Sequence, residues 1–462
     1  MASASRLALE LGISQPTFSR LAGSLQGQVL SCGHARATRY FVPREVPGVR
    51  QPVPLYEVRP RGERLRKAGE VHAAGARGFI VALADRPAQF FEDLPWFLEH
   101  ARPSGFLGRL VPRRHPELNL PPEVRNWSGD HALRFATRVG WDLPGAFILG
   151  DEACARFLEE IGRPSGIVDA AERHVRYPAI AQDLLAFGPG GSSAAGEQPK
   201  FLATRRLQDR LTPVLVKFSP PTGESLGTRS ADLLIAEHVA LSVAGDHGFV
   251  APPSCILFGG ERVFLEVERF DREGIDHRIG QVSLESLDAE FAGTDLTSWS
   301  VSAQVLAARG VVPRDAVPGI RWLETFGRLI GNTDMHFGNL SFRLDGTRVS
   351  SLSPVYDMLP MHYHPRQGEL PQVDHPLPVL GPGVADVAGS ALLAAVDFWG
   401  RLAGDDRASD EFRALAIGHE GPFAACPGQE QPRHAQPLVL RAKPLQRGVV
   451  QGRRVVLSGG RF

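Results

Sequence analysis

In Gly331-Asn332-Thr333-Asp334-Met335-His336-Phe337-Gly338-Asn339, an Asp and an Asn lie five positions apart. An apolar segment follows and ends in a further acid, Asp357, within Ser353-Pro354-Val355-Tyr356-Asp357. This spacing is typical of the catalytic loop of protein kinases and the metal-binding Asp that follows it. Phosphoryl transfer needs one carboxylate to meet the incoming hydroxyl and further oxygen ligands to hold Mg²⁺ against the phosphates. The stretch therefore predicts a kinase-like fold.

Two upstream segments occur in the order in which a kinase uses them. The first is rich in small residues and runs from Gly188 to Lys200. Such residues allow a backbone to close over phosphates, although a plain linker explains the composition equally well. The second is the apolar run Pro213–Phe218, which carries Lys217 in its interior. A Lys inside a strand is usually an edge residue, but in a kinase it contacts the nucleotide phosphates.

Two more segments continue this order. Residues 230–241 have a helical pattern in which Glu237 lies among apolar neighbours. Most such Glu residues are surface residues of a helix. The alternative is that Glu237, twenty residues after the strand Lys, pairs with Lys217 and fixes its ammonium. Residues 263–272 read as a strand that runs into a charged turn, as expected of a hinge between two lobes.

Four motifs together resemble the HipA family of bacterial serine/threonine kinases, which are toxins of toxin–antitoxin systems. The resemblance covers roughly residues 56 to 416 and implies an α+β, two-lobed protein-kinase-like HipA fold that uses ATP and Mg²⁺. The motifs that carry it are Ser193-x-Ala195-Gly196-x-Gln198-x-Lys200, Val267-Glu268-Arg269-Phe270-Asp271-Arg272, Thr333-Asp334-x-His336-x-x-Asn339 and Pro354-x-Tyr356-Asp357.

The resemblance also implies a role for individual residues. Asp334 is expected to be the catalytic base, and Asn339 and Asp357 the Mg²⁺ ligands. The residues expected at ATP are Ser193 and Gly196 in the Gly-rich loop, Lys217 on the phosphates, Glu268 and Phe270 at the adenine, and His336 as a packing or nucleotide-contacting residue.

Ser193 lies where members of the HipA family autophosphorylate and thereby silence the enzyme. The physical reason is that a phosphate adds nearly two negative charges to a loop that should cradle the phosphates of ATP. Pro199 and Phe337-Gly338 fill variable positions of the motifs, so they leave the chemistry intact.

The first fifty residues indicate a separate unit. A short helix, a turn containing Gly12 and a second helix that begins near Ser14 have helix-turn-helix spacing. Ser14 is suited to cap the second helix, and Pro16 is tolerated in its first turn. In such a motif the second helix enters the major groove of DNA. The candidate base contacts are Gln15, Thr17, Ser19 and Arg20.

Residues 28–42 read as a hairpin, the wing of a winged helix. Residues 1–50 hold six arginines and two acids, a net charge of +4 in a chain whose formal net charge is zero. This local excess is expected of a DNA-binding unit. A motif used only for protein contact is the alternative. Only five residues precede Arg6, too few for the further helix that a winged helix needs. The two alternatives are a start that lies further upstream and a unit that lacks its first helix.

The composition is that of an ordinary soluble protein. The 462 residues are 43% hydrophobic and 22% charged, which supports two or three domains. No segment approaches eighteen uncharged apolar residues, so no membrane partner is expected. The four cysteines are widely spread and form no C-x-x-C pair, which fits a reducing cytoplasm.

The segments and compositional changes divide the chain into five parts. The tail is expected to be disordered, because it is rich in proline and lacks apolar periodicity. The parts are 1–52 (winged helix-turn-helix), 56–175 (HipA-type N-terminal subdomain), 176–320 (N-lobe and hinge), 321–417 (C-lobe with catalytic loop) and 418–462 (tail).

The expected function is therefore a HipA-type serine/threonine kinase acting as a growth-inhibiting toxin. Its expected partners are a protein substrate, by analogy an aminoacyl-tRNA synthetase or another translation factor, DNA and an antitoxin. Two alternatives stay open at this point. One is a small-molecule phosphotransferase, which would not need autophosphorylation at Ser193. The other is a transcription regulator whose kinase fold only senses a nucleotide.

Overall fold

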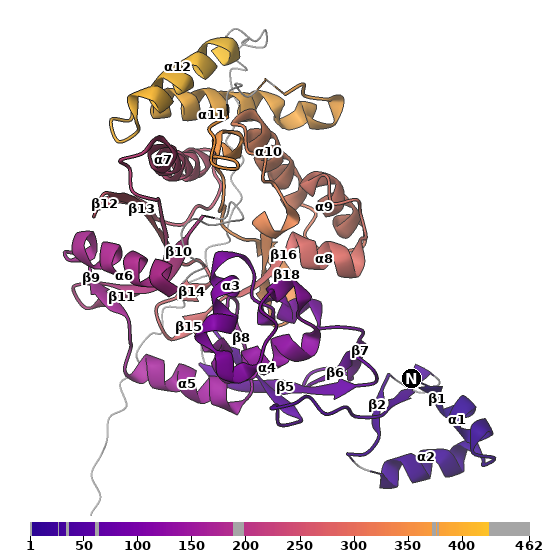
Figure 1. Ribbon diagram of the computed structural model, residues 1–462. Helices are drawn as coiled ribbons and strands as arrows, with labels where there is room; N and C mark the ends of the chain where they lie inside the picture. Colours follow the sequence, from indigo (N-terminus) through magenta and orange to yellow (C-terminus); the bar gives the residue numbers. More distant parts are fainter. Residues whose placement is uncertain are drawn as a thin grey trace, which may run out of the picture.

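The N-terminal unit contains two short helices and a small sheet (Figure 1). A computed structural model describes residues 2–424 except 26, 34–36, 61–63, 188–197, 372–375 and 377. The Ser14 side chain accepts a hydrogen bond from the Thr17 N–H and so caps the second helix. The sheet has the order β1-β3-β2. Its elements are β1 (Ala2–Ser3), α1 (Ala4–Glu10), α2 (Gln15–Ser24), β2 (Leu30–Cys32) and β3 (Arg39–Phe41).

The middle domain is built on a five-stranded antiparallel sheet of order β7-β6-β5-β4-β8. Its apolar face is continuous with the core of the C-lobe, because Trp96 packs edge-on against Phe291 with ring centroids 5.4 Å apart. The elements are β4 (Val53–Val58), β5 (Leu65–Ala74), β6 (Gly78–Leu83), β7 (Gln89–Phe91), the 3₁₀ helix η2 (Trp96–Ala101), α3 (Gly105–Arg114), η3 (Pro116–Leu118), η4 (Val124–Asn126), α4 (Gly129–Val139), η5 (Gly140–Asp142), β8 (Phe147–Leu149) and α5 (Asp151–Gly162).

The N-lobe is a second five-stranded sheet, of order β12-β13-β11-β10-β9, with α6 and α7 packed beside it. β9 pairs in parallel with β10, so it lies with this sheet although the sequence groups residues up to 175 with the middle domain. The elements are β9 (Ile167–Asp169), α6 (Arg173–Phe187), β10 (Lys200–Leu207), β11 (Arg210–Phe218), α7 (Ser225–Asp246), β12 (Ser254–Gly259) and β13 (Arg262–Glu268).

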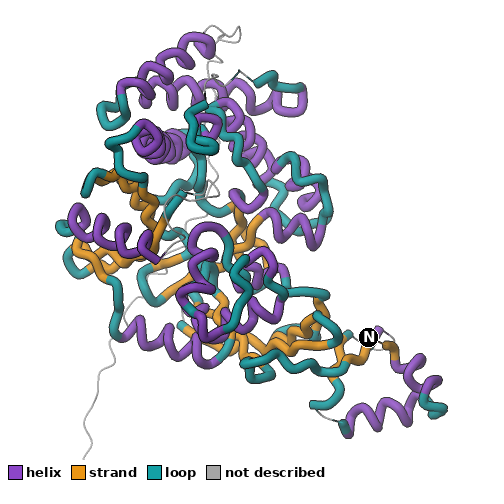
Figure 2. The backbone as a smooth tube through the Cα atoms, in the orientation of Figure 1, coloured by secondary structure: helices purple, strands orange, loops and turns teal. Residues whose placement is uncertain are grey.

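The C-lobe is mainly helical (Figure 2). It also carries a three-stranded sheet of order β16-β17-β18. β16 comes before the loop of residues 331–339 in the sequence, and β17 comes after it, yet the two strands are paired. The C-lobe therefore starts near residue 280 rather than 321. The elements are the hinge hairpin β14 (Arg272–Glu273) and β15 (His277–Arg278), then β16 (Gly280–Ser283), α8 (Leu284–Phe291), α9 (Trp299–Ala308), α10 (Ala316–Leu329), η6 (Phe337–Asn339), β17 (Ser341–Asp345), β18 (Arg348–Leu352), η7 (Met361–Tyr363), η8 (Pro382–Val384), α11 (Ala385–Ala403) and α12 (Asp410–Ala424).

The last helix continues past the boundary that the sequence indicates at residue 417. In α12, His419 is buried and stacks on Trp399 with ring centroids 4.4 Å apart. His419 also shares a hydrogen bond with Tyr363 in η7. Residues 418 and 419 therefore belong to the C-lobe, while 425–462 lie outside the described residues.

One helix in the described part of the chain, Pro382–Ala403, is long and apolar enough to cross a membrane by length and composition alone. It comprises η8 and α11. Phe398, Trp399 and Leu402 are completely buried, and α11 packs against α7, α10 and α12. One face of the helix thus packs in the core, and 33% of its apolar window is buried.

Candidate active site

Lys217 makes a buried ion pair with Glu237, as the sequence indicates. It lies on β11, between β10 and β13, and is 4% exposed. Its Nζ donates to both Glu237 oxygens at 2.7 and 2.8 Å. Glu237 lies on α7, whose apolar face packs against the sheet. The same Nζ also donates to the Asp357 carboxylate. The two lobes therefore meet at this ammonium.

Lys217 favours the charge on both carboxylates of this triad, but the two carboxylates oppose each other. Burial raises the pKa of Glu237, Lys217 counters this rise, and Asp357 adds to it. Burial opposes the ammonium charge, but the Asp357 and Glu237 carboxylates outweigh it and raise the pKa of Lys217. Burial likewise works against an ionised Asp357, yet Lys217 and Lys200 hold the pKa of that carboxyl well below its usual range. Lys217 is therefore a cation and Asp357 an anion at neutral pH.

The catalytic loop is held by hydrogen bonds from two asparagines. Asn332 is buried and accepts from the Asp334 N–H at 3.1 Å, while its Nδ2 donates to the Asp357 carbonyl at 3.3 Å. Asn339 Nδ2 donates to the Asp334 carbonyl at 2.9 Å. Sequence reasoning missed the role of Asn332, although it lies within the quoted stretch. It fixes the distance between the two acids by holding both of their backbones.

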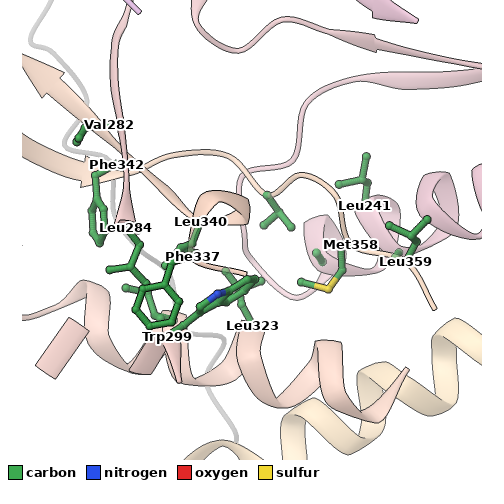
Figure 3. Packing of buried hydrophobic residues seen from close by; sticks show 14 of the residues in the cluster. Leu241, Val282, Leu284, Trp299, Leu323, Phe337, Leu340, Phe342, Met358 and Leu359 are labelled. Atoms are coloured by element: carbon green, nitrogen blue, oxygen red, sulfur yellow. The ribbon is translucent and has the colours of Figure 1, made fainter. Parts of the chain in front are cut away.

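Apolar anchors flank the functional residues (Figure 3). Phe337 and Leu340, on either side of Asn339, pack with Leu284, Trp299 and Leu323 of the C-lobe helices. Met358 and Leu359 follow Asp357 directly and face Leu241 of α7 in the same view. Because these side chains are buried, the polar groups between them have little freedom to move. Phe337, at a variable motif position, thus has a packing role.

Asn339 and Asp357 provide donors that suit Mg²⁺. The Asn339 amide donates through Nδ2, which leaves its oxygen to accept or to coordinate. Asp357 contributes an ionised carboxylate, and its φ of 51° is the left-handed conformation that residues other than Gly rarely adopt. No group of three His, Cys, Asp or Glu side chains in the described residues makes a metal site by itself. The remaining ligands would therefore come from phosphate and water, as is usual for Mg²⁺.

Asp334 is exposed and lines a pocket of about 330 Å³ on the C-lobe. Trp299, Arg328 and His336 line the same pocket. His336 Nδ1 accepts from the Gly338 N–H at 3.1 Å, and its carbonyl accepts from Trp299 at 3.2 Å. A side chain that enters this pocket can bring a hydroxyl to Asp334, while His336 shapes the turn.

Phe270 contacts the segment that carries the metal-binding candidate. Its ring lies 5.4 Å from that of Tyr356, tilted by 30°. The Tyr356 hydroxyl donates to the Gly338 carbonyl at 2.7 Å. Tyr356, which precedes Asp357, therefore contacts both Phe270 of the hinge and Gly338 of the catalytic loop.

The Glu268 side chain does not lie on the same face of the sheet as Lys217. In β13, Glu268 is paired with Val214 and Leu265 with Lys217, so Glu268 and Lys217 point to opposite faces of the sheet. The Glu268 carboxylate accepts from Arg205 on that outer face. Only the backbone of Glu268 can then face an adenine on the Lys217 side.

This placement gives a testable difference between the two hinge residues. Glu268→Ala should change the KM for ATP by no more than about twofold, the size of a substitution outside a site. Phe270→Ala should raise it by up to about tenfold, because it removes the aromatic contact with Tyr356. Steady-state kinetics with varied ATP measures both values. A large effect of Glu268→Ala with none of Phe270→Ala would contradict the assignment.

Two of the expected ATP-binding residues, Ser193 and Gly196, lie outside the described residues. The end of their motif is described. Gln198 donates from its side chain to the Phe218 carbonyl, and the Phe218 N–H donates to the Pro199 carbonyl at 3.0 Å. Residues 198–200, at the end of the motif, therefore join the sheet beside Lys217.

The four candidate DNA contacts lie on α2. Gln15, Thr17, Ser19 and Arg20 are all exposed. Thr17 is partly engaged in the helix cap, since its hydroxyl lies 2.8 Å from that of Ser14. Phe18 is buried between them and packs edge-on against Tyr40 at 4.9 Å.

Two protein families match the chain. Residues 49–158 match the YjjJ-like toxin middle domain, and residues 192–389 match the HipA-like C-terminal domain. Among solved structures, HipA from the Shewanella oneidensis MR-1 complex of HipA, HipB and operator DNA is 16% identical, with a TM-score of 0.46, and covers 81% of this chain and 96% of its own. The Helicobacter pylori proinflammatory kinase CtkA is 12% identical, with a TM-score of 0.35, and covers 49% and 91%.

The full-length comparison settles the family. Toxin YjjJ of Escherichia coli (strain K12) is 36% identical over 421 residues, which is 90% of this chain and 93% of that protein. The resemblance to HipA inferred from the motifs is confirmed by the C-terminal match. The chain belongs to the family of YjjJ-like toxins with a HipA-like C-terminal domain.

Proposed function

We propose that the chain is an ATP- and Mg²⁺-dependent serine/threonine protein kinase of the HipA type. The observation that supports this most is the buried contact of Lys217 with both Glu237 and Asp357. A strand Lys fixed by a helix Glu is the arrangement that protein kinases use to hold nucleotide phosphates. The neighbouring catalytic loop, with Asp334 exposed and Asn339 buried, supplies the other parts that the reaction needs.

Each residue then has a defined task. Lys217 holds the phosphates of ATP, and Glu237 keeps its ammonium in place. Asn339 and Asp357 hold Mg²⁺, which when bound neutralises charge on the transferring phosphoryl group. Asp334 orients the hydroxyl of a substrate Ser or Thr and accepts its proton. The Phe270 backbone and ring help to seat the adenine.

We further propose that the enzyme is a growth-inhibiting toxin that silences itself at Ser193. The name of its relative, toxin YjjJ, supports the first part. Phosphate on Ser193 would repel the phosphates of ATP beside Lys217 and Lys200. A translation factor such as an aminoacyl-tRNA synthetase is the proposed substrate, by analogy with other HipA kinases, and the proposed setting is the cytoplasm.

Controlled expression in cells tests this proposal. Wild-type protein should arrest growth, and Asp334→Ala should not, because it lacks the proposed base. Ser193→Ala should arrest growth for longer, since it cannot be silenced at that residue. A small-molecule phosphotransferase would show no difference between wild type and Ser193→Ala. Equal toxicity of wild type and Asp334→Ala would overturn the kinase proposal.

The N-terminal unit is proposed to bind DNA through α2. Arg20→Ala should weaken binding to DNA from upstream of the chain's own gene by about 1–3 kcal/mol if Arg20 reads a base. Arg6→Ala is the matched control, because Arg6 lies on α1 and is paired with Glu10 at 2.9 Å. Fluorescence anisotropy at two salt concentrations measures both. Equal losses in the two variants would indicate a charge effect without base contact, and full binding by Arg20→Ala would remove α2 as the reading helix.

A further inference from the structure

A pocket of about 240 Å³ lies behind the hinge, away from the proposed catalytic residues. Its walls come from three parts of the chain: α5 of the middle domain, β10 and β11 of the N-lobe, and the hinge with its hairpin. Phe157, Leu202 and Ile275 give it apolar walls, and Arg269, Arg272 and Arg278 give it charge.

The arginines of this pocket outnumber the carboxylates that they contact. Arg269 and Arg272 are buried and share the same two acids. Arg269 donates to Asp142 at 2.8 Å and to Asp271 at 3.0 Å, while Arg272 donates to Asp142 at 2.8 Å and to Asp271 at 2.6 Å. These four side chains balance one another, so Arg278 is left with a charge that neither acid neutralises by contact.

Arg278 is 1% exposed, and much of its guanidinium is without a polar partner. Its Nη2 donates to the Trp141 carbonyl, and its Cζ lies 4.6 Å from the centre of the Phe157 ring. Nε and Nη1 are buried and have no hydrogen-bond partner among the described residues. Burial and the neighbouring Arg272 lower the pKa of Arg278 well below its ordinary value. A buried guanidinium with idle donors is costly unless an anion compensates it.

A third carboxylate at the pocket does not serve this purpose. Glu160 accepts from Arg156 and from the Ser165 N–H, the latter at 2.9 Å. The Ser165 hydroxyl also donates to it at 2.8 Å. Glu160 is therefore engaged by its own neighbours, and the excess positive charge at Arg278 remains.

We propose that this pocket binds a compact oxyanion, a phosphate or carboxylate group on a small molecule, through Arg278. Nη1 and the second N–H of Nη2 form the parallel pair at the end of the planar guanidinium, and this pair matches two oxygens of such an anion. The volume is below that of pockets for drug-sized ligands, and the apolar walls accommodate a small body next to the charged group.

The pocket is separate from the proposed site of the ATP phosphates. Thr204 and Pro213, which line it, lie four residues along their strands from Lys200 and Lys217. At about 3.3 Å per residue, this is a separation of roughly 13 Å. An anion there would contact the hinge and both neighbouring domains, so its occupancy would tie these three parts together.

Anion titration of the full chain tests the site without measuring catalysis. Inorganic phosphate and citrate are added to the apo protein, with sodium chloride at matched ionic strength as the reference, and the Tm is followed. One or both anions should raise the Tm above the reference in a saturable manner. A response to phosphate alone assigns a phosphorylated ligand, and a response to citrate alone a carboxylate ligand.

Three variants locate the response. Arg278→Met should weaken the apparent affinity at least tenfold, and Thr204→Trp, which narrows the pocket but keeps Arg278, should do the same. Lys217→Met should lower the Tm without added anion, because it leaves Glu237 and Asp357 without their cation, but should retain the anion-dependent rise above that baseline. The proposal is overturned if neither anion gives a saturable response, if both pocket variants respond like the wild type, or if only Lys217→Met loses the response. Should Arg278→Met fail to fold, Thr204→Trp decides.

Discussion

Asp357→Asn should reduce phosphoryl transfer at least about 10³-fold while the protein stays folded. Loss of one group that stabilises transition-state charge typically lowers the rate 10²- to 10³-fold, and Asp357 has two such tasks. It contacts Lys217 and is one of the two proposed Mg²⁺ ligands. The amide of Asn has nearly the same shape but carries no charge. The measurement is the initial rate of phosphate transfer from labelled ATP to the protein itself.

The matched control for this change is Asp345→Asn. Asp345 ends β17 in the same lobe and is exposed, so the same chemical change there should leave the rate within about twofold. Equal rates for wild type and Asp357→Asn would contradict the assignment of Asp357 to the metal. A parallel loss in Asp345→Asn would indicate a general loss of folding.

Glu237→Leu should lower the free energy of unfolding by about 3–5 kcal/mol. Removing one partner of a buried ion pair leaves the other charge uncompensated, and here that charge is Lys217. The contact with Asp357 compensates part of it, so the lower end of the range is expected. Replacing both residues, as in Lys217→Met with Glu237→Leu, should recover only part of the stability, because the Glu237 charge is removed together with the ammonium but the Asp357 carboxylate loses its contact with Lys217.

Urea unfolding measures these values. Glu290→Leu is the control, since Glu290 is an exposed residue of α8 and should change stability by less than about 0.5 kcal/mol. If Glu237→Leu is as stable as the wild type, the pair does not hold Lys217 as described. If the double variant is less stable than Glu237→Leu, the cost arises from packing or from the Asp357 carboxylate that loses Lys217.

Most of what the sequence predicts about the site follows from the spacing of residues that lie close together in the chain. Asp334 and Asn339 lie in one loop, and Asp357 follows on the next strand connection, so a short motif contains their arrangement. The pairing of Lys217 with Glu237 was also accessible, because a strand and the helix that follows it usually lie side by side. Their side chains form the ion pair in the structure.

The features that depend on pairing between distant strands could not be predicted from the sequence. β9 joins the N-lobe sheet by a parallel pairing with β10, and β16 pairs with β17 across some sixty residues. No local pattern records either contact, so the domain limits at 175 and 320 differ from the structure. For the same reason the sequence did not reveal that the Glu268 side chain lies on the face of the sheet opposite Lys217. It depends on the register between β11 and β13, which a sequence does not specify.

The buried arginines of the hinge show a related limit. The sequence identifies Arg269, Asp271 and Arg272 as a charged turn, which suggests exposure to solvent. In the structure these side chains are buried against Asp142, which lies more than a hundred residues earlier in the chain. Charge alone does not reveal burial when the compensating group is distant in sequence.

The most direct test of the central claim is phosphate labelling of the purified chain. Wild-type protein and Asp334→Ala are incubated with Mg²⁺ and labelled ATP, and the labelled residue is then mapped. The account predicts label on Ser193 or Ser192 in the wild type and none in Asp334→Ala. Absence of label from wild-type protein that binds ATP, or equal labelling of the two proteins, would contradict it.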